Sequence, residues 1–328
     1  MIIARAPFRI SFFGGGTDYP EFFKQHGGAT LLTAIDQYCY ISIHHLTSFF
    51  QHRFRASYAK TESVQHPTEF HHPLIRETLL QMDITEGLEI SHVADMPGRT
   101  GLGSSSSFTV ALLHALHTLK NETVTPAQLA TEAIHIERIR VGDAGGHQDQ
   151  YAAAYGGFKR LDFHQNGQVS VRPVTAPECH IQALQQHLVM FYTGVEQSAE
   201  NILREQRNRT GQNLAALKTM LGMVNTAEEL LHAGRISDIG TLLHESWQLK
   251  KNLSNGISNG LIDGAYDAAC KAGARGGKML GAGGRGFLLL LAAPEKHAAI
   301  RHQLSQLREV NFKFSDQGSR IIFTDTTP

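Results

Sequence analysis

The stretch from Pro97 to Ser107 combines glycines with four consecutive serines, a pattern suited to holding a phosphate group. Residues 88–93 alternate as a strand does, and residues 104–119 carry apolar side chains at helical spacing. Glycines let backbone N–H groups approach an anion closely, and the start of a helix adds unpaired N–H groups and the positive end of its dipole. The serine hydroxyls can hold phosphate oxygens or Mg²⁺. A turn with serine helix caps and no ligand is the alternative, but the order strand, loop, helix favours phosphate binding.

Two common nucleotide-binding signatures do not fit this sequence. A Walker A loop needs a lysine after its last glycine, and none follows Gly103. Gly281, Gly283 and Gly286 have the spacing of a dinucleotide-binding fingerprint. That fingerprint opens a helix, whereas residues 286–292 are apolar and predict a buried strand. The phosphate loop therefore indicates a different class of nucleotide-binding protein.

The composition is that of an ordinary globular protein. Hydrophobic residues make up 41% of the 328 residues, and 30 Lys and Arg balance 30 Asp and Glu. Nucleic-acid binders usually carry a basic excess, so this balance argues against a nucleic-acid partner. No apolar run could span a bilayer, and the N-terminus resembles a strand more than a leader, so we expect a cytoplasmic protein without a membrane partner. Three scattered cysteines and 19 histidines without ligand spacing predict reduced thiols and no zinc site.

Periodicity and turn residues predict a chain of mixed α+β structure, with a domain boundary near residue 180. Strands are expected at 1–13, 29–46, 88–93, 187–194, 286–292 and 319–324, with a hairpin partner for the second strand near 52–58. Helices are expected at 104–119, 197–208, 212–233, 235–252, 260–272 and 294–309, and a short helical stretch at 149–155.

A further helix has a clear start. Thr125 is a good N-cap, Pro126 suits the first helical position, and Gln128 completes a capping box. The apolar face that we expect it to bury consists of Leu129, Ala133, Ile136 and Ile139.

Three segments, in order along the chain, resemble motifs of the GHMP kinases. They are Pro7–Ile10 with Gly14–Asp18, then Pro97–Ser106, then Gly281–Phe287. The resemblance implies a two-domain α+β fold: an ATP-binding N-terminal domain over residues 1–180 and a ferredoxin-like C-terminal domain over 181–328, with the active site between them. Arg285 stands where the family usually has glycine, and its role is open.

Within this family the chain is most similar to the branch that acts on D-glycero-D-manno-heptose 7-phosphate. The similarity lies in the triple glycine at 14–16, the segments 33–38 and 318–323, and Trp247–Lys251. It implies transfer of the γ-phosphate of ATP to the anomeric hydroxyl, feeding nucleotide-activated heptose synthesis for surface glycans. A kinase for fucose, galactose or a related sugar is one alternative, and a non-catalytic sensor of ATP and sugar is another. The sequence leaves open whether the chain forms a homo-oligomer.

The resemblance assigns catalytic roles to two residues. Asp149 lies in a segment, Gly146–Tyr151, like the family's Asp-Gln catalytic segment, which implies a general base that accepts the proton of the attacking hydroxyl. Arg9 matches the basic residue on the first strand, which stabilises the transferring phosphoryl group or the nucleophile. Without the resemblance, a helix N-cap would be the favoured interpretation of Asp149 and a solvated strand residue that of Arg9. The three motifs in order favour the catalytic roles instead.

The resemblance also implies ATP and Mg²⁺ as cofactors. Glu137 and Ser105 would hold Mg²⁺, although Glu137 could equally be a surface residue beside two arginines. The residues expected to bind the ATP phosphates are Pro97, Gly98, Gly101, Leu102, Gly103, Ser104, Ser105 and Ser106.

The acceptor is expected to meet the glycine loop and a basic segment. Asp18 would accept hydrogen bonds from sugar hydroxyls, and either Lys250 or Lys251 would bind a phosphate that the sugar already carries. Exposed lysines and an Asx-turn are the alternative explanations. The full set of expected substrate residues is Gly15, Gly16, Thr17, Asp18, Gly283, Lys250 and Lys251.

Overall fold

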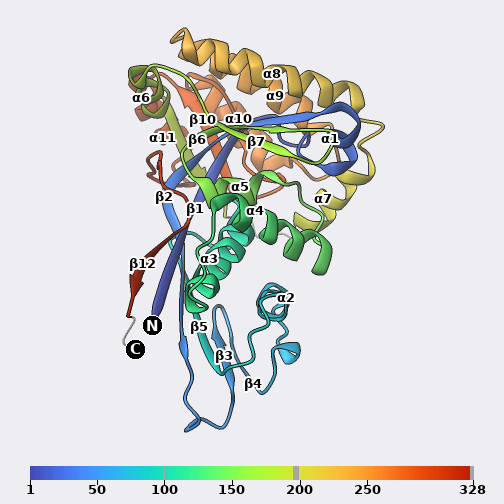
Figure 1. The fold of residues 1–328 in the computed structure, drawn as a ribbon. Coiled ribbons are helices and arrows are strands. Elements are labelled where there is room, and N and C mark those ends of the chain that lie inside the picture. Colours follow the sequence, from blue (N-terminus) through green and yellow to red (C-terminus); the bar gives the residue numbers. More distant parts are fainter. Residues whose placement is uncertain (99, 195–198, 326–328) are drawn as a thin grey trace.

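A computed structural model describes residues 1–98, 100–194 and 199–325 of the chain. Its larger sheet has eight strands, in the order β12-β1-β2-β5-β3-β4, with β6 paired to β2 and β7 to β6 (Figure 1). The strands are β1 (Ile2–Phe13), β2 (Gly28–His45), β3 (Phe54–Ser57), β4 (Thr61–Val64), β5 (Leu88–Ala94), β6 (Phe158–Phe163), β7 (Val169–Pro173) and β12 (Arg320–Thr324).

Strand β2 organises this sheet because its two halves have different neighbours on one side. Residues 28–33 pair with β6 and residues 39–45 pair with β5, while β1 pairs along most of its length. The expected hairpin partner near 52–58 exists as β3, but it pairs with β4 and β5. The hairpin prediction was therefore wrong, because β5 occupies the edge of β2 that a hairpin would have used.

Helices α3 and α5 pack against β1, the strand that carries Arg9, and α4 packs against both of them. Helix α3 begins where the phosphate loop ends, as expected, and α4 begins at the predicted capping box of Thr125 and Gln128. The helices of this half are α1 (Pro20–His26), η1 (Pro67–Glu69), α2 (Pro73–Gln81), α3 (Ser104–Leu119), α4 (Pro126–Ile134), the π-helix η2 (His135–Arg140), α5 (Gln148–Tyr155) and α6 (Glu178–Gln186).

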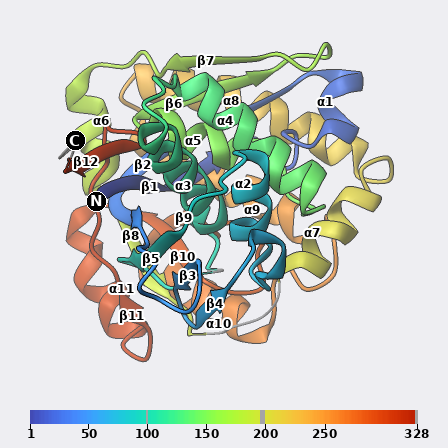
Figure 2. The ribbon, with the colours of Figure 1, turned by 60° about the horizontal axis from the view of Figure 1, so that its bottom comes forward.

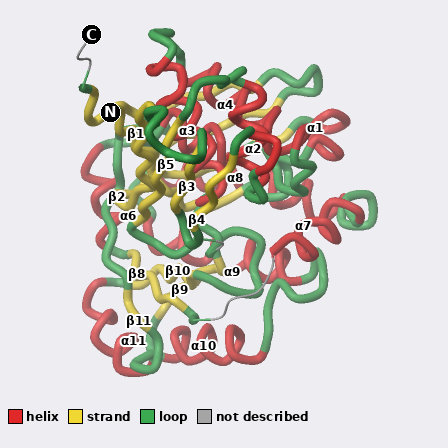
Figure 3. The backbone as a smooth tube through the Cα atoms, turned by 90° about the horizontal axis from the view of Figure 1, so that it is seen from below, coloured by secondary structure: helices red, strands yellow, loops and turns green. Residues whose placement is uncertain are grey.

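A second sheet has four antiparallel strands in the order β11-β8-β10-β9, and it lies at one end of the molecule with α10 and α11 beside it (Figure 3). Taken in chain order these strands are placed 4-1-3-2, the arrangement of a ferredoxin-like sheet, as expected. The strands are β8 (Leu188–Tyr192), β9 (Ala274–Met279), β10 (Phe287–Ala292) and β11 (Arg308–Glu309). Strand β9 was not predicted, because its two glycines, Gly276 and Gly277, resemble a loop in the sequence.

The helices between β8 and β9 correspond to the four that were expected, except that residues 197 and 198 of the first prediction lie outside the described part. They are α7 (Ala199–Asn208), α8 (Leu214–His232), α9 (Ile236–Lys251) and α10 (Gly260–Lys271). The helix expected at 294–309 is shorter, a 3₁₀ turn η3 (Pro294–Lys296) followed by α11 (His297–Gln303). Among the described residues no helix has the length and apolarity needed to cross a membrane.

The end of the chain returns to the first sheet. Strand β12 pairs antiparallel with β1, so that Ile2 lies opposite Thr324, and the first and last strands of the described chain are neighbours (Figure 2). Helices α8 and α9 also contact β1. A single boundary at residue 180 therefore does not separate the two sheets, because residues 320–324 belong to the first.

Candidate active site

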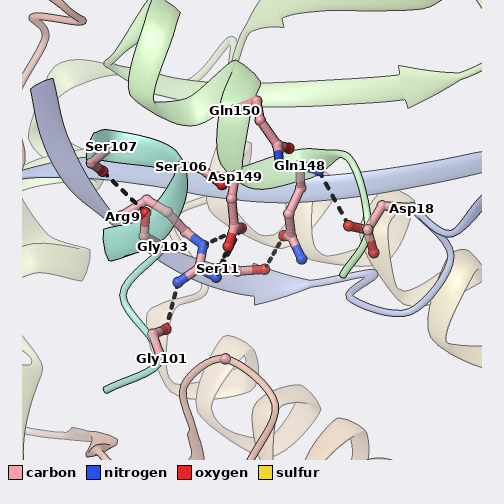
Figure 4. A network of polar contacts seen from close by, with 12 residues as sticks. Arg9, Ser11, Asp18, Gly101, Gly103, Ser106, Ser107, Gln148, Asp149 and Gln150 are labelled. Carbon is pink, nitrogen blue, oxygen red and sulfur yellow. Dashed lines mark hydrogen bonds and ion pairs between the residues drawn. The ribbon is translucent and has the colours of Figure 1, made fainter. Parts of the chain in front are cut away.

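Arg9 and Asp149 form a two-pronged ion pair at the centre of the site (Figure 4). Arg9 Nε donates to Oδ1 of Asp149 at 2.8 Å and Nη2 donates to Oδ2 at 2.9 Å. The third arm, Nη1, donates to the carbonyl of Gly101 at 2.6 Å. Arg9 is buried in the middle of β1, and Asp149 is the second residue of α5. Two residues that are 140 positions apart, and that were predicted to act together, thus meet beside the phosphate loop.

The phosphate loop wraps around this pair. Gly103, the N-cap of α3, has a left-handed φ of 78°, and a Cβ on it would lie 3.4 Å from both Arg9 and Asp149. The loop also touches the start of the C-terminal glycine turn, residues 281–286, because a Cβ on Gly101 would lie 2.4 Å from the Leu280 carbonyl. The first turn of α3 therefore directs its unpaired N–H groups toward the region beside Asp149, where an anion would be stabilised.

The other predicted loop residues differ in exposure. Pro97, Gly98 and Ser105 are exposed and Ser104 is half-buried, so a nucleotide can reach them. Leu102 is fully buried, which leaves only its backbone to face a ligand.

Glu137 is hydrogen-bonded to Ser106, whereas Ser105, the serine expected to hold Mg²⁺ with it, is exposed. Ser106 Oγ donates to Oε2 of Glu137 at 2.9 Å, and Gln150 Nε2 donates to the same oxygen at 2.8 Å. Ser105 lies one position earlier on α3, which turns its side chain by about 100° and leaves it exposed, so the expectation that Ser105 and Glu137 hold Mg²⁺ together stays a prediction.

The second carboxylate oxygen of Glu137 is suited to serve as a ligand of a metal ion. Glu137 is fully buried, and in the described part of the chain its Oε1 has no hydrogen-bond partner. Burial raises the pKa of this carboxyl group to about 7. An unpartnered oxygen on a buried carboxylate is costly unless a cation or proton meets it, so the group suits Mg²⁺.

A π-helix places Glu137 inside. The chain leaves α4 at Ile134 and continues as the wider helix η2, His135–Arg140. The wider turn changes which positions face inward: Glu137 is buried, while Ile139 is 70% exposed. The prediction that Ile139 lies on the buried face was therefore wrong. The sequence shows no signal for this π-helix, although such segments occur often at functional sites.

Asp18 is held rigidly in the loop between β1 and α1. Its Oδ1 accepts from the Gly16 N–H at 2.9 Å, and its Oδ2 accepts from the Gln148 N–H at 3.2 Å. Gly146 must be glycine, since a Cβ there would lie 2.0 Å from Oδ2 of Asp18. Burial raises the pKa of Asp18. The carboxylate is thus fixed near Asp149, and each of its oxygens has a lone pair left to accept from a ligand.

Two of the predicted substrate residues are buried and contact other parts of the fold. Thr17 is fully buried, and its hydroxyl lies 2.8 Å from the Gly14 carbonyl and 2.9 Å from the Ala29 carbonyl. These contacts close the glycine loop. Gly283 is buried against Ile257, since a Cβ on it would lie 2.6 Å from the Ile257 carbonyl. Both residues are buried in the fold, and the expectation that they contact the substrate stays a prediction.

The two predicted lysines point in different directions from α9. Lys250 is buried, and its Nζ donates to the carbonyls of Met279, at 3.3 Å, and Gly281. Burial and, to a lesser extent, the charge of Arg9 lower the pKa of Lys250 to about 7, although the charge of Asp18 acts in the opposite direction. Lys251 lies 3.4 Å from Asp263, and its ammonium is 6.0 Å from the centre of the Trp247 ring. Of these two lysines, Lys250 is the one that lies near Arg9 and Asp18.

A third lysine was missed. Lys278 of β9 is buried and donates to the Phe12 carbonyl of β1 at 2.8 Å. Burial lowers its pKa, and the charges of Lys250 and Arg9 lower it further. The sequence offered no signal for this role, because a lysine in a glycine-rich stretch resembles an exposed loop residue.

Two family models match the chain. Residues 71–157 match the model described as the GHMP kinases N terminal domain, and residues 227–308 match the model described as the GHMP kinases C terminal domain. The first range contains the phosphate loop, Glu137 and Asp149, and the second contains Lys250, Lys278 and the C-terminal glycine turn.

Two of the similar proteins are sugar kinases by their names. The D-glycero-alpha-D-manno-heptose 7-phosphate kinase of Campylobacter jejuni is 28% identical over 97% of this chain and 97% of its own length. The bifunctional fucokinase/GDP-fucose pyrophosphorylase of Arabidopsis thaliana is 26% identical over 76% of this chain and 25% of its own length.

Solved structures share the fold. A D-glycero-D-manno-heptose 1-phosphate kinase from Bacteroides thetaiotaomicron superposes with a TM-score of 0.82 at 24% identity, over 99% of this chain and 100% of that one. Lactococcus lactis galactokinase in complex with galactose superposes with a TM-score of 0.78 at 18% identity, over 97% and 94% of the two chains.

Proposed function

We propose that this chain, which belongs to the GHMP kinase family and is an ATP-dependent sugar kinase, phosphorylates the anomeric hydroxyl of D-glycero-D-manno-heptose 7-phosphate. The product would be the 1,7-bisphosphate, a precursor of nucleotide-activated heptose for surface glycans. The observation that carries the catalytic part is the Arg9–Asp149 pair beside Gly103 at the start of α3. It brings a base, a cation and a phosphate-binding helix end within reach of one another.

Asp149 serves as the general base. Its carboxylate accepts the proton of the attacking hydroxyl while the oxygen of that hydroxyl forms its bond to the γ-phosphorus. The bond from the γ-phosphorus to the β–γ bridging oxygen breaks, and that oxygen leaves with ADP. Arg9 holds both carboxylate oxygens, which fixes their orientation, and its positive charge lies beside the negative charge that gathers on the transferring phosphoryl group. The N-terminal turn of α3 binds the phosphates of ATP with backbone N–H groups and the hydroxyls of Ser104 and Ser105.

Glu137, through its unpartnered Oε1, and a serine of α3 would hold Mg²⁺. When bound, the ion would neutralise charge on the phosphates of ATP and help to orient them. Gln150 and Ser106 position the carboxylate by donating to its other oxygen.

Lys250 supports an acceptor that already bears a phosphate. Its ammonium is buried close to Arg9 and Asp18, and among the described residues its hydrogen-bond partners are two backbone carbonyls rather than a carboxylate. A buried cation that no carboxylate contacts directly is stabilised by an incoming anion. A neutral sugar would not supply that anion, whereas a sugar phosphate would.

The acceptor panel tests the proposal. ADP release is measured with heptose 7-phosphate, mannose 6-phosphate, free heptose, fucose and galactose, and the kcat/KM values are compared. We expect heptose 7-phosphate to have the highest value. A preference for fucose or galactose would replace the heptose assignment by another sugar kinase activity. No ADP release with any sugar, from folded protein that binds ATP, would leave the non-catalytic sensor as the function.

A further inference from the structure

The side chain of Gln148 lies between the two carboxylates of the site and has an unused donor. Gln148 begins α5, directly before the proposed base Asp149, and its backbone N–H binds Asp18. Figure 4 shows its side chain between Asp149 and Asp18. Its Oε1 accepts a hydrogen bond from Ser11 Oγ at 2.7 Å. In the described part of the chain its Nε2 has no acceptor, and this nitrogen stays accessible to solvent although the residue is half-buried.

Ser11 fixes which way this amide faces. Ser11 is buried on β1, two positions after Arg9 and therefore on the same face of the strand. Since its hydroxyl donates to Oε1, the amide nitrogen is turned away from Ser11 and toward Gly15. A polar pair at this place adds nothing to the hydrophobic core, so its orientation calls for another explanation.

The absence of a side chain at Gly15 offers an explanation for this orientation. The neighbouring Gly14 and Gly16 have left-handed φ angles of 80° and 100°, so the backbone requires glycine at both positions, whereas Gly15 has no such φ. A Cβ on Gly15 would meet only Nε2 of Gln148 at 3.7 Å and Oγ of Ser11 at 3.9 Å, which are ordinary contacts. Neither conformation nor packing demands glycine here. The absent side chain keeps open the space beside the amide nitrogen, which suits a ligand that approaches the backbone.

We propose that Gln148 binds the sugar acceptor, donating from Nε2 to a hydroxyl or ring oxygen, with Ser11 as the residue that orients the amide and Gly15 as the gap that admits the ring. The inference rests on the proposed sugar kinase function and names which residues of that site recognise the acceptor. The amide lies between Asp18, which accepts from sugar hydroxyls, and Asp149, which accepts from the attacking hydroxyl, so the oxygen that Gln148 binds belongs to the part of the sugar between those two carboxylates. The donor of Gln148 between two acceptors then sets the rotation of the sugar ring relative to Asp149.

The test uses three variants of the full chain, Gln148→Met, Ser11→Ala and Gly15→Ala, with Gln303→Met on the exposed end of α11 as the matched control. The acceptor is whichever sugar of the panel has the highest kcat/KM with the wild-type protein. Losing one neutral hydrogen bond should raise the acceptor KM of Gln148→Met by about tenfold, with the KM for ATP within about twofold of wild type. Gly15→Ala should keep its melting temperature and raise the acceptor KM at least as much, because the methyl group occupies the space of the ring.

Ser11→Ala separates orientation from direct binding. We expect about a threefold rise in acceptor KM in the wild-type background and no further rise in the Gln148→Met background, since Ser11 acts through the amide. An unchanged acceptor KM in Gln148→Met, or a Gly15→Ala protein with wild-type kinetics, would overturn the inference while the wild-type activity upholds the proposed function. A rise in KM for ATP equal to that for the sugar would also overturn it, because the amide would then serve the nucleotide.

Discussion

Both carboxylate oxygens of Asp149 are held by one guanidinium, that of Arg9, with donor–acceptor distances of 2.8 and 2.9 Å. This pair joins the middle of β1 to the start of α5, and Gly103 at the end of the phosphate loop packs on it. A two-pronged contact leaves the carboxylate no freedom to rotate, so any hydroxyl that reaches it meets an oxygen in a fixed place.

Replacing Asp149 with Asn should abolish turnover and leave ATP binding largely intact. Asparagine keeps the shape but cannot accept the proton, and loss of a general base usually costs roughly a hundredfold to ten-thousandfold in rate. The measurement is kcat together with the dissociation constant of ATP. The matched control is Asp162→Asn, since Asp162 is also paired with an arginine, Arg160 at 2.8 Å, but on β6. Near wild-type turnover in folded Asp149→Asn would show that Asp149 is not the base.

Replacing Glu137 with Gln should separate stability from activity. The amide keeps the size of the side chain and an oxygen that can accept from Ser106 and Gln150, but it removes a buried carboxylate whose Oε1 has no partner in the described part of the chain. We therefore expect an unchanged or higher melting temperature without Mg²⁺, together with a higher Mg²⁺ concentration for half-maximal activity. Ser106→Ala should raise the Mg²⁺ requirement less. An unchanged Mg²⁺ requirement in Glu137→Gln would remove this residue from the metal site.

The sequence predicted the elements whose periodicity is regular and missed those that depart from it. Strand β1 and helix α3 follow from alternation and from helical spacing, and α4 follows from the capping box at Thr125. The π-helix after Ile134 changes the inward-facing positions without any signal in the side chains, which is why Ile139 was misplaced. The cluster of Lys250 and Lys278 arises from long-range packing of α9 and β9 on β1, and no local pattern encodes it.

Lys250 and Lys251 should differ sharply when each is replaced. Lys250→Met fills the same buried space without charge and should raise the KM for heptose 7-phosphate by tenfold or more, because a charge-assisted hydrogen bond is lost. Lys251→Met serves as its neighbour control, since Lys251 faces Asp263 and Trp247. Its KM should stay within about twofold of wild type. Free heptose should be used equally well by both variants, and an equal loss for both acceptors would mean that Lys250 supports the fold and not the phosphate.

The use of a phosphorylated acceptor should weaken as pH rises through about 7, the pKa to which burial lowers Lys250. Below that pH the folded protein carries the ammonium that a phosphate needs, and above it the free site loses the proton. Between about pH 7 and the ordinary lysine pKa of 10.5, the unfolded chain binds one more proton than the folded chain. The cost that burial of Lys250 imposes on stability is therefore present at low pH and relieved as pH rises.

Binding of a phosphate should raise the pKa of Lys250 again, so that the site takes up a proton. The KM for heptose 7-phosphate, measured from pH 6 to 9, should therefore rise above about pH 7 in the wild-type protein. In Lys250→Met the same profile should be flat over this range, and the KM for ATP serves as the internal control. A wild-type profile that Lys250→Met reproduces would assign the titration to another group, with Lys278 as the next lysine to replace.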